Sequence, residues 1–177
     1  MVHIKYFKKY YFINEFNPTH LINLNKNISF IWRNKDKETS IKTLIKLRDF
    51  CKKNQRFLYI SNDINLALKV CADGVYIAST NKNLCLRSIS LKKKFKILGS
   101  AHNLKEIRIK EFQNVEEIFL SPLFKKKNNN QLNIYNYLKL KKITKMKDIS
   151  LGGIDNRKIK KLNMIKPFGF AGISYFE

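Results

Sequence analysis

The most regular feature of the chain is a succession of short apolar runs, rich in β-branched and aromatic residues and separated by more polar segments. Several of these runs are apolar at nearly every position, which is typical of parallel strands that are buried on both faces. The pattern predicts eight strands, at residues 9–15, 28–33, 56–61, 73–78, 95–100, 116–121, 148–153 and 168–174.

The segments between the predicted strands have the residue spacing of helices. The clearest lies at residues 38–54, where apolar positions recur on one helical face. These positions are Ile41, Leu44, Ile45, Leu47 and Phe50. A shorter helix is predicted to follow Asp63.

Polar residues at cap positions indicate where two further helices begin. Asn103 is a predicted N-cap, and Glu106 stands at the capping-box spacing from it. Either Asp155 or Asn156 is predicted to cap a helix that runs through Leu162.

Regular alternation of strands and helices predicts right-handed crossovers and a parallel sheet. Eight such units predict an α/β fold of the TIM (β/α)₈ barrel type, as a single domain over residues 1–177. The barrel would be shortened, since this fold typically takes ~250 residues. Residues 17–27 leave room for little helix, and Ser174 is close to the end of the chain. Reduced first and last helical units are therefore expected, with an open flavodoxin-like sheet as the structural alternative.

The composition indicates a folded globular protein. Hydrophobic residues make up 44% of the 177 residues, which argues against disorder. No apolar run approaches the ~20 residues that span a bilayer, and no signal peptide is recognisable, so a cytoplasmic location is expected. The cysteines, Cys51, Cys71 and Cys85, have no CxxC spacing and indicate neither disulfides nor zinc. The sequence leaves homo-oligomerisation open.

The net charge of +23 raises the question of nucleic-acid binding. Most of the 36 basic residues are lysines, whereas base-reading proteins depend on arginine for bidentate contacts. The excess is spread along the whole chain, so we do not expect nucleic acid as a partner. The same charge favours an anionic, phosphorylated substrate.

Glycines are concentrated near the C-terminus. Four of the six stand at Gly152, Gly153, Gly169 and Gly172, each at the end of an apolar run or inside one. In a (β/α)₈ barrel the loops after strands seven and eight donate backbone N–H groups to a phosphate. The two glycine segments are therefore predicted to be two turns of a phosphate site, with ordinary ligand-free turns as the alternative.

Polar residues also follow the other predicted strands, where a barrel places its functional groups. Arg33 and Lys35 follow the second strand and offer positive charge for a diphosphate. Asn62 and Asp63 follow the third and suit a hard cation or a substrate amine. Further candidates come after the fifth and sixth strands. These are Ser100, His102 and Ser121.

Six segments in this order resemble the thiamine-phosphate synthase and TenI family. The resemblance implies a TIM barrel that joins an aminopyrimidine pyrophosphate to a thiazole phosphate, giving thiamine phosphate and pyrophosphate. The matching segments are WRNK (32–35), SNDINLALKVCADGVYI (61–77), GSAHNLKEI (99–107), IFLSPLF (118–124), SLGGID (150–155) and AGIS (171–174).

Carried over to this chain, the resemblance implies a diphosphate site at Arg33, Lys35 and Asn62, with Asp63 as a ligand of Mg²⁺. Ser100 and His102 would be the catalytic residues. The thiazole phosphate and the rest of the substrates would contact residues of the later strand ends. These are Ser121, Gly152, Gly153, Gly172, Ile173 and Ser174.

The chain departs from the family pattern at three places. Thr80 or Asn81 stands where a second metal-binding aspartate is expected, Tyr76 replaces a histidine, and lysines 125–127 replace a threonine-rich loop. A second reading is a TenI-like thiazole phosphate tautomerase, in which His102 transfers protons without a metal. A third is a barrel that binds phosphate ligands without turnover.

Overall fold

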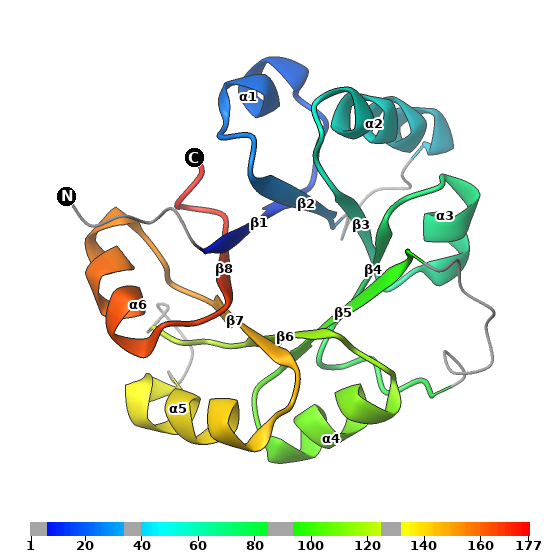
Figure 1. Ribbon diagram of the computed structural model, residues 1–177. Coiled ribbons are helices and arrows are strands. Elements are labelled where there is room, and N and C mark those ends of the chain that lie inside the picture. Colours follow the sequence, from blue (N-terminus) through cyan, green and yellow to red (C-terminus); the bar gives the residue numbers. More distant parts are fainter. Residues whose placement is uncertain (1–6, 34–39, 85–93, 125–131) are drawn as a thin grey trace.

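The computed structural model describes residues 7–33, 40–84, 94–124 and 132–177. In this part of the chain, eight parallel strands form a closed ring with the helices outside it (Figure 1). The strands are β1 (Lys8–Ile13), β2 (Ile28–Trp32), β3 (Leu58–Ser61), β4 (Gly74–Ile77), β5 (Lys96–Ala101), β6 (Glu117–Leu120), β7 (Lys147–Leu151) and β8 (Gly169–Gly172). The α-helices are α1 (Pro18–Asn23), α2 (Ile41–Lys53), α3 (Ile64–Lys69), α4 (Leu104–Phe112), α5 (Asn133–Ile143) and α6 (Ile159–Ile165).

Pairing of the first and last strands closes the barrel. Lys8 lies opposite Gly169, and Tyr11 lies opposite Gly172. A Cβ atom at Gly169 would lie 2.5 Å from the carbonyl oxygen of Lys8, so this close approach requires glycine. The TIM-barrel prediction is confirmed, and the open-sheet alternative is wrong.

Alternation along the strands gives two cores. One set of buried side chains fills the inside of the barrel, while the residues between them pack outward against the helices. The interior set consists of Tyr10, Phe12, Ile31, Tyr59, Tyr76, Leu98, Phe119, Ile149 and Ala171. Burial on both faces explains why the strands are apolar at nearly every position in the sequence.

The end of the barrel at which the strands begin is closed by side chains. The hydroxyl of Tyr10 donates to one carboxylate oxygen of Glu117, and Lys8 donates to the other at 2.7 Å. Glu117 is only 2% exposed, so its buried charge is paired by the partly buried Lys8.

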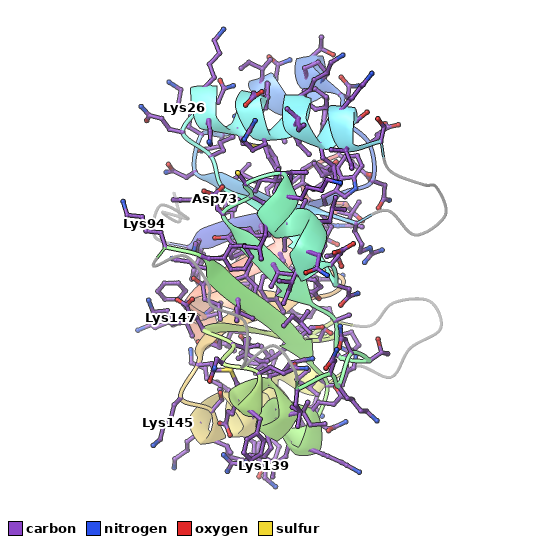
Figure 2. All side chains as sticks on the ribbon, turned by 90° about the vertical axis from the view of Figure 1, so that its right-hand side faces the viewer. Lys26, Asp73, Lys94, Lys139, Lys145 and Lys147 are labelled. Atoms are coloured by element: carbon purple, nitrogen blue, oxygen red, sulfur yellow. The ribbon has the colours of Figure 1, made fainter. Side chains whose placement is uncertain are left out.

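Several lysines lie at this same end of the molecule. Figure 2 shows Lys26, Lys94, Lys145 and Lys147 there, on the loops that lead into the strands and at the first residue of β7. These charges therefore lie at the end of the barrel opposite the loops that follow the strands.

The predicted caps begin their helices. The side chains of Asp63, Asn103 and Asp155 accept hydrogen bonds from the backbone of Leu66, Glu106 and Lys158, respectively. Asp155 caps a 3₁₀ turn, η3 (Asn156–Lys158), that leads directly into α6.

Glu106 differs from an ordinary capping box. Its carboxylate accepts a hydrogen bond from the backbone N–H of His102 at 2.7 Å, one residue before the cap, and another from the Asn103 amide. The start of α4 is thereby linked to the backbone of a candidate site residue.

The first and last units are reduced, as the sequence predicts. Helix α1 has 6 residues, and the carbonyl groups of Leu21 and of the C-cap residue Leu24 accept from the buried side chain of Arg56. After β8 the chain makes a turn over residues 174–176, and residues 173–177 contain no helix.

Candidate active site

A cavity of about 1050 Å³ opens at the end of the barrel where the strands finish. Every strand, or the loop directly after it, contributes to its wall, as in TIM barrels generally. The lining residues are Phe12, Arg33, Ser61, Asn62, Tyr76, Ala78, Ser79, Thr80, Ser100, His102, Ser121, Pro122, Leu151, Gly152, Gly153, Ile154, Gly172, Ile173 and Ser174.

Most of the residues expected from the sequence meet in this cavity. Ten of the twelve predicted positions line it: Arg33, Asn62, Ser100, His102, Ser121, Gly152, Gly153, Gly172, Ile173 and Ser174. Lys35 lies outside the described residues, as do the lysines at 125–127. Asp63 is described, but it is not part of the cavity wall.

His102 is held from three directions. Its backbone N–H donates to Glu106, and its Nδ1 atom lies 2.7 Å from the carbonyl oxygen of Ser121. A carbonyl oxygen only accepts, so Nδ1 carries a proton. In the neutral ring, Nε2 is then the acceptor, and the hydroxyl of Ser79 donates to it across 3.0 Å.

Tyr76 and Ser100 form a polar pair beside this histidine in the cavity wall. Burial raises the pKa of Tyr76 to about 12, opposed by the hydrogen bond with Ser100 and by the positive charge of Arg33. The phenol is therefore neutral near pH 7 and remains a hydrogen-bond donor for a bound anion.

Arg33 and Asn62 supply polar groups at the ends of β2 and β3. The Arg33 guanidinium lies 5.5 Å from the centre of the Phe12 ring, and its buried Nε has no hydrogen-bond partner among the described residues. Asn62 has a φ of 60° and accepts a hydrogen bond from the Ala78 backbone at 2.8 Å. These contacts hold both side chains at the mouth of the cavity, where N–H groups of the guanidinium and of the Asn62 amide can donate to a ligand.

Gly152 and Gly153 form a left-handed turn after β7, with φ values of 99° and 65°. A Cβ atom would lie 2.9 Å from Pro122 at the first position and 2.9 Å from the Phe124 carbonyl oxygen at the second. Both positions therefore require glycine for conformation and for space. The first predicted glycine turn is confirmed.

Hydrogen bonds hold this turn in one orientation. The carbonyl groups of Leu151 and Gly152 accept from the backbone after β6, and that of Gly153 accepts from Lys158 at 2.7 Å. Within the described part of the chain, the N–H groups of Gly153 and Ile154 donate to no acceptor. Because these N–H groups lie in the cavity wall and are left without a protein acceptor there, they suit an anion in the cavity.

The second glycine segment is a turn only at its end. Gly169 and Gly172 are the first and last residues of β8, and the turn follows at residues 174–176. Gly169 is required for close pairing with β1 and not for a turn, so that part of the prediction is wrong. A Cβ at Gly172 would meet only ordinary contacts, at 3.6 Å or more, so its lack of a side chain leaves space in the cavity.

Comparison with known proteins now identifies the family. A family model described as thiamine monophosphate synthase matches residues 24–176. The chain belongs to this family. It is 31% identical over 147 residues to a putative thiamine-phosphate synthase 2 of Aquifex aeolicus, covering 80% of this chain and 77% of that protein. It is 26% identical over 153 residues to a thiamine-phosphate synthase of Hydrogenobaculum, covering 83% and 70%.

A solved structure supports the fold of this thiamine monophosphate synthase family member. The thiamine phosphate pyrophosphorylase from Pyrococcus furiosus superposes with a TM-score of 0.75 at 16% identity, covering 95% of this chain and 86% of that one. At this identity the likeness shows the fold alone. Among the described helices, none has the length and apolar character needed to cross a membrane.

The residues that the structure describes do not fit a protein-bound Mg²⁺ ion. Magnesium prefers carboxylate and water oxygens in octahedral geometry, yet none of the described cavity residues is Asp or Glu. Over the described ranges, no group of three or more His, Cys, Asp and Glu residues comes together. Asp63 uses one oxygen to cap α3, 2.8 Å from the Leu66 nitrogen. The predicted metal role of Asp63 therefore stays a prediction.

Some site residues could not be recognised from the sequence. Ser79 follows a predicted strand, but nothing in its spacing shows that it bonds His102. The ammonium group of Lys158 donates to the Gly153 carbonyl oxygen. In the sequence, Lys158 is marked only by its position 3 residues after the cap residue Asp155. Phe12 supports Arg33 from β1, a contact between neighbouring strands that appears only in the closed barrel.

Proposed function

We propose that this chain joins an aminopyrimidine diphosphate to a thiazole phosphate, forming thiamine phosphate and releasing pyrophosphate. The observation that carries the proposal is the placement of two anion-binding groups on opposite sides of one cavity. Arg33 and Asn62 follow β2 and β3, while the Gly152–Gly153 turn follows β7. Strands three and seven are four places apart in an eight-stranded ring, so the two groups face each other across the mouth.

The glycine turn is the proposed site of the thiazole phosphate. Backbone N–H groups of Gly153 and Ile154, with the chain at Ile173 and Ser174 beside them, are suited to a phosphate because they can donate hydrogen bonds to its oxygens. The empty space at Gly172 lets the ligand approach the backbone closely. The thiazole ring would then extend toward the centre of the cavity.

The opposite side is the proposed site of the diphosphate. In the reaction, the bond between the pyrimidine methylene carbon and the diphosphate oxygen breaks, and a bond between that carbon and the thiazole nitrogen forms. The bonding electrons leave with pyrophosphate, so negative charge grows on the leaving group. The Arg33 guanidinium and the neutral Tyr76 hydroxyl are placed to stabilise that charge.

His102 and Ser100 are proposed to orient the reacting rings between these two sites. The hydrogen bonds to Ser121 and Ser79 fix the plane of the imidazole, and Ser100 lies on the same strand, two residues earlier. Since the carboxylates needed for a protein-bound Mg²⁺ are absent from the described cavity wall, no step is assigned to a metal here.

A tautomerase would use the same histidine for proton transfer, but both curated relatives have synthase names, so this alternative is not favoured. His102→Gln distinguishes the two. It should lower coupling less than about tenfold, whereas a reaction that depends on general acid–base catalysis loses about 10²-fold or more.

Calorimetry tests the two-site arrangement. Thiazole phosphate and inorganic pyrophosphate should each bind at a 1:1 ratio, and saturation with one should leave the site for the other open. Competition between them for a single site would contradict the proposal.

A further inference from the structure

Lys110 is a buried charged residue with no assigned role. It lies on α4, and its side chain is 0% exposed. Its ammonium group donates to the carbonyl oxygens of Ala78 and Asn81 and to the side-chain oxygen of Gln113, each at 2.8 Å. An ammonium has three protons, so this set uses every donor.

Gln113, which follows α4, contacts the same loop after β4 as Lys110 does. It is also 0% exposed, and its amide nitrogen donates to the carbonyls of Asn81 and Asn83, at 3.1 and 2.8 Å. Together the two side chains hold the loop over residues 78–83, which follows β4 and has neither helix nor strand structure. The backbone carbonyls of Ala78, Asn81 and Asn83 thus accept hydrogen bonds from side chains on α4 and at its C-cap.

This loop carries Ser79, whose hydroxyl lies 3.0 Å from Nε2 of His102. Helix α4 also holds His102, because Glu106 on this helix accepts a hydrogen bond from the His102 backbone N–H at 2.7 Å. Glu106 and Lys110 are four residues apart, so they lie on one face of α4. A single helix thus sets the position of both groups in the Ser79–His102 hydrogen bond.

We propose that Lys110, together with Gln113, is a positioning residue that holds the Ser79 hydroxyl against Nε2 of His102. The hydroxyl satisfies the Nε2 lone pair and keeps the ring in the plane that it presents to the cavity. Lys110 does not line the cavity and touches no substrate in this arrangement. Its effect on the reaction rests on the proposed function, but its effect on His102 does not.

A purely structural role would look different. Burying an ammonium group is costly, and a methionine of similar length fills the same space without a charge. If Lys110 only fills the core, Lys110→Met should leave the imidazole unchanged. If it positions Ser79, the same change should weaken the hydrogen bond to Nε2.

Nitrogen-15 NMR of the His102 side chain, recorded on the neutral form of the ring, tests this on the free protein. Ser79→Ala should move the Nε2 resonance downfield, toward that of an unbonded nitrogen. Lys110→Met should move it in the same direction, and the double variant should match Ser79→Ala. An unchanged resonance in folded Lys110→Met, or additive shifts in the double variant, would overturn the proposal.

Gln113→Met provides a second route if Lys110→Met does not fold, because it removes the amide contacts and keeps the ammonium. It should shift the same resonance by a smaller amount, and no shift would overturn the proposal. In the coupling reaction, these variants should lower kcat several-fold with little change in KM for thiazole phosphate. If the chain forms no thiamine phosphate at all, the NMR result still decides the role of Lys110, and only the proposed function fails.

Discussion

The ammonium group of Lys158 lies 2.7 Å from the carbonyl oxygen of Gly153 and 3.3 Å from the carboxylate of Asp155. The carbonyl of the glycine turn is therefore fixed by a residue outside the cavity wall. Since the carbonyl is held there, the adjoining N–H groups remain for a ligand. The turn is thus set in position before any phosphate binds, which lowers the entropic cost of binding.

Gly153→Val should abolish this site without unfolding the barrel. Its φ of 65° and the Phe124 carbonyl 2.9 Å from a Cβ force the turn to change, at a cost of about 1–3 kcal/mol. Thiazole phosphate affinity, measured by calorimetry, should fall at least about tenfold. Gly169→Ala is the control, because it should lower the melting temperature and leave binding intact. Unchanged affinity in Gly153→Val would remove the phosphate assignment.

Arg33→Ala should weaken the diphosphate side selectively. Losing charge-assisted hydrogen bonds costs about 1.5–3 kcal/mol, so the KM for the pyrimidine diphosphate should rise by about 10- to 100-fold. The KM for thiazole phosphate should stay the same. Arg108→Ala removes an exposed arginine that pairs with Glu111, and it should affect neither constant. An equal rise in both constants for Arg33→Ala would contradict separate sites.

The alternation of strands and helices was enough to predict eight strands, and each begins and ends within two residues of its predicted bounds. Parallel strands buried on both faces give a signal at every position, and that signal needs no knowledge of distant contacts. The caps at Asp63, Asn103 and Asp155 were also readable, because capping is a contact over three residues.

Contacts between elements that are distant in the sequence could not be predicted from it. Gly169 looks like a turn residue until β8 is paired with β1, and the proximity of Ser79 to His102 depends on how α4 packs on the loop after β4. Lys110 has the sequence appearance of a solvated lysine, since helix α4 has almost no amphipathic pattern that would show it as buried. These relations arise from closure of the barrel and not from local preference.

Asp63→Asn separates a cap from a metal ligand. Asparagine caps helices about as well as aspartate, so the free energy of unfolding should change little. Because Asp63 does not line the cavity, turnover with saturating Mg²⁺ should stay within about threefold of the unmodified chain. Asp63→Ala, which also loses the cap, should cost about 1 kcal/mol of stability. A tenfold or greater loss in Asp63→Asn, with a higher Mg²⁺ requirement, would establish the metal role.

Lys110 should give the stability of the protein a distinctive pH dependence. Burial lowers the pKa of Lys110 from 10.5 to about 8, and the charge of Glu106 opposes this shift. Between these values the unfolded chain binds more protons than the folded one, so the free energy of unfolding rises with pH. Relative to Lys110→Met, the rise from pH 8 to 10.5 should be about 3 kcal/mol in urea titrations. Parallel pH curves for the two proteins would contradict the assignment.

Pyrophosphate release provides the most direct measurement of the central claim. The purified chain should be incubated with aminopyrimidine diphosphate and Mg²⁺, with and without thiazole phosphate, while pyrophosphate and thiamine phosphate are both quantified. We predict equal amounts of the two products, formed only when both substrates are present and reduced in Arg33→Ala and Gly153→Val. Absence of thiamine phosphate with intact binding of both ligands would contradict the account and leave a barrel that binds phosphates without turnover.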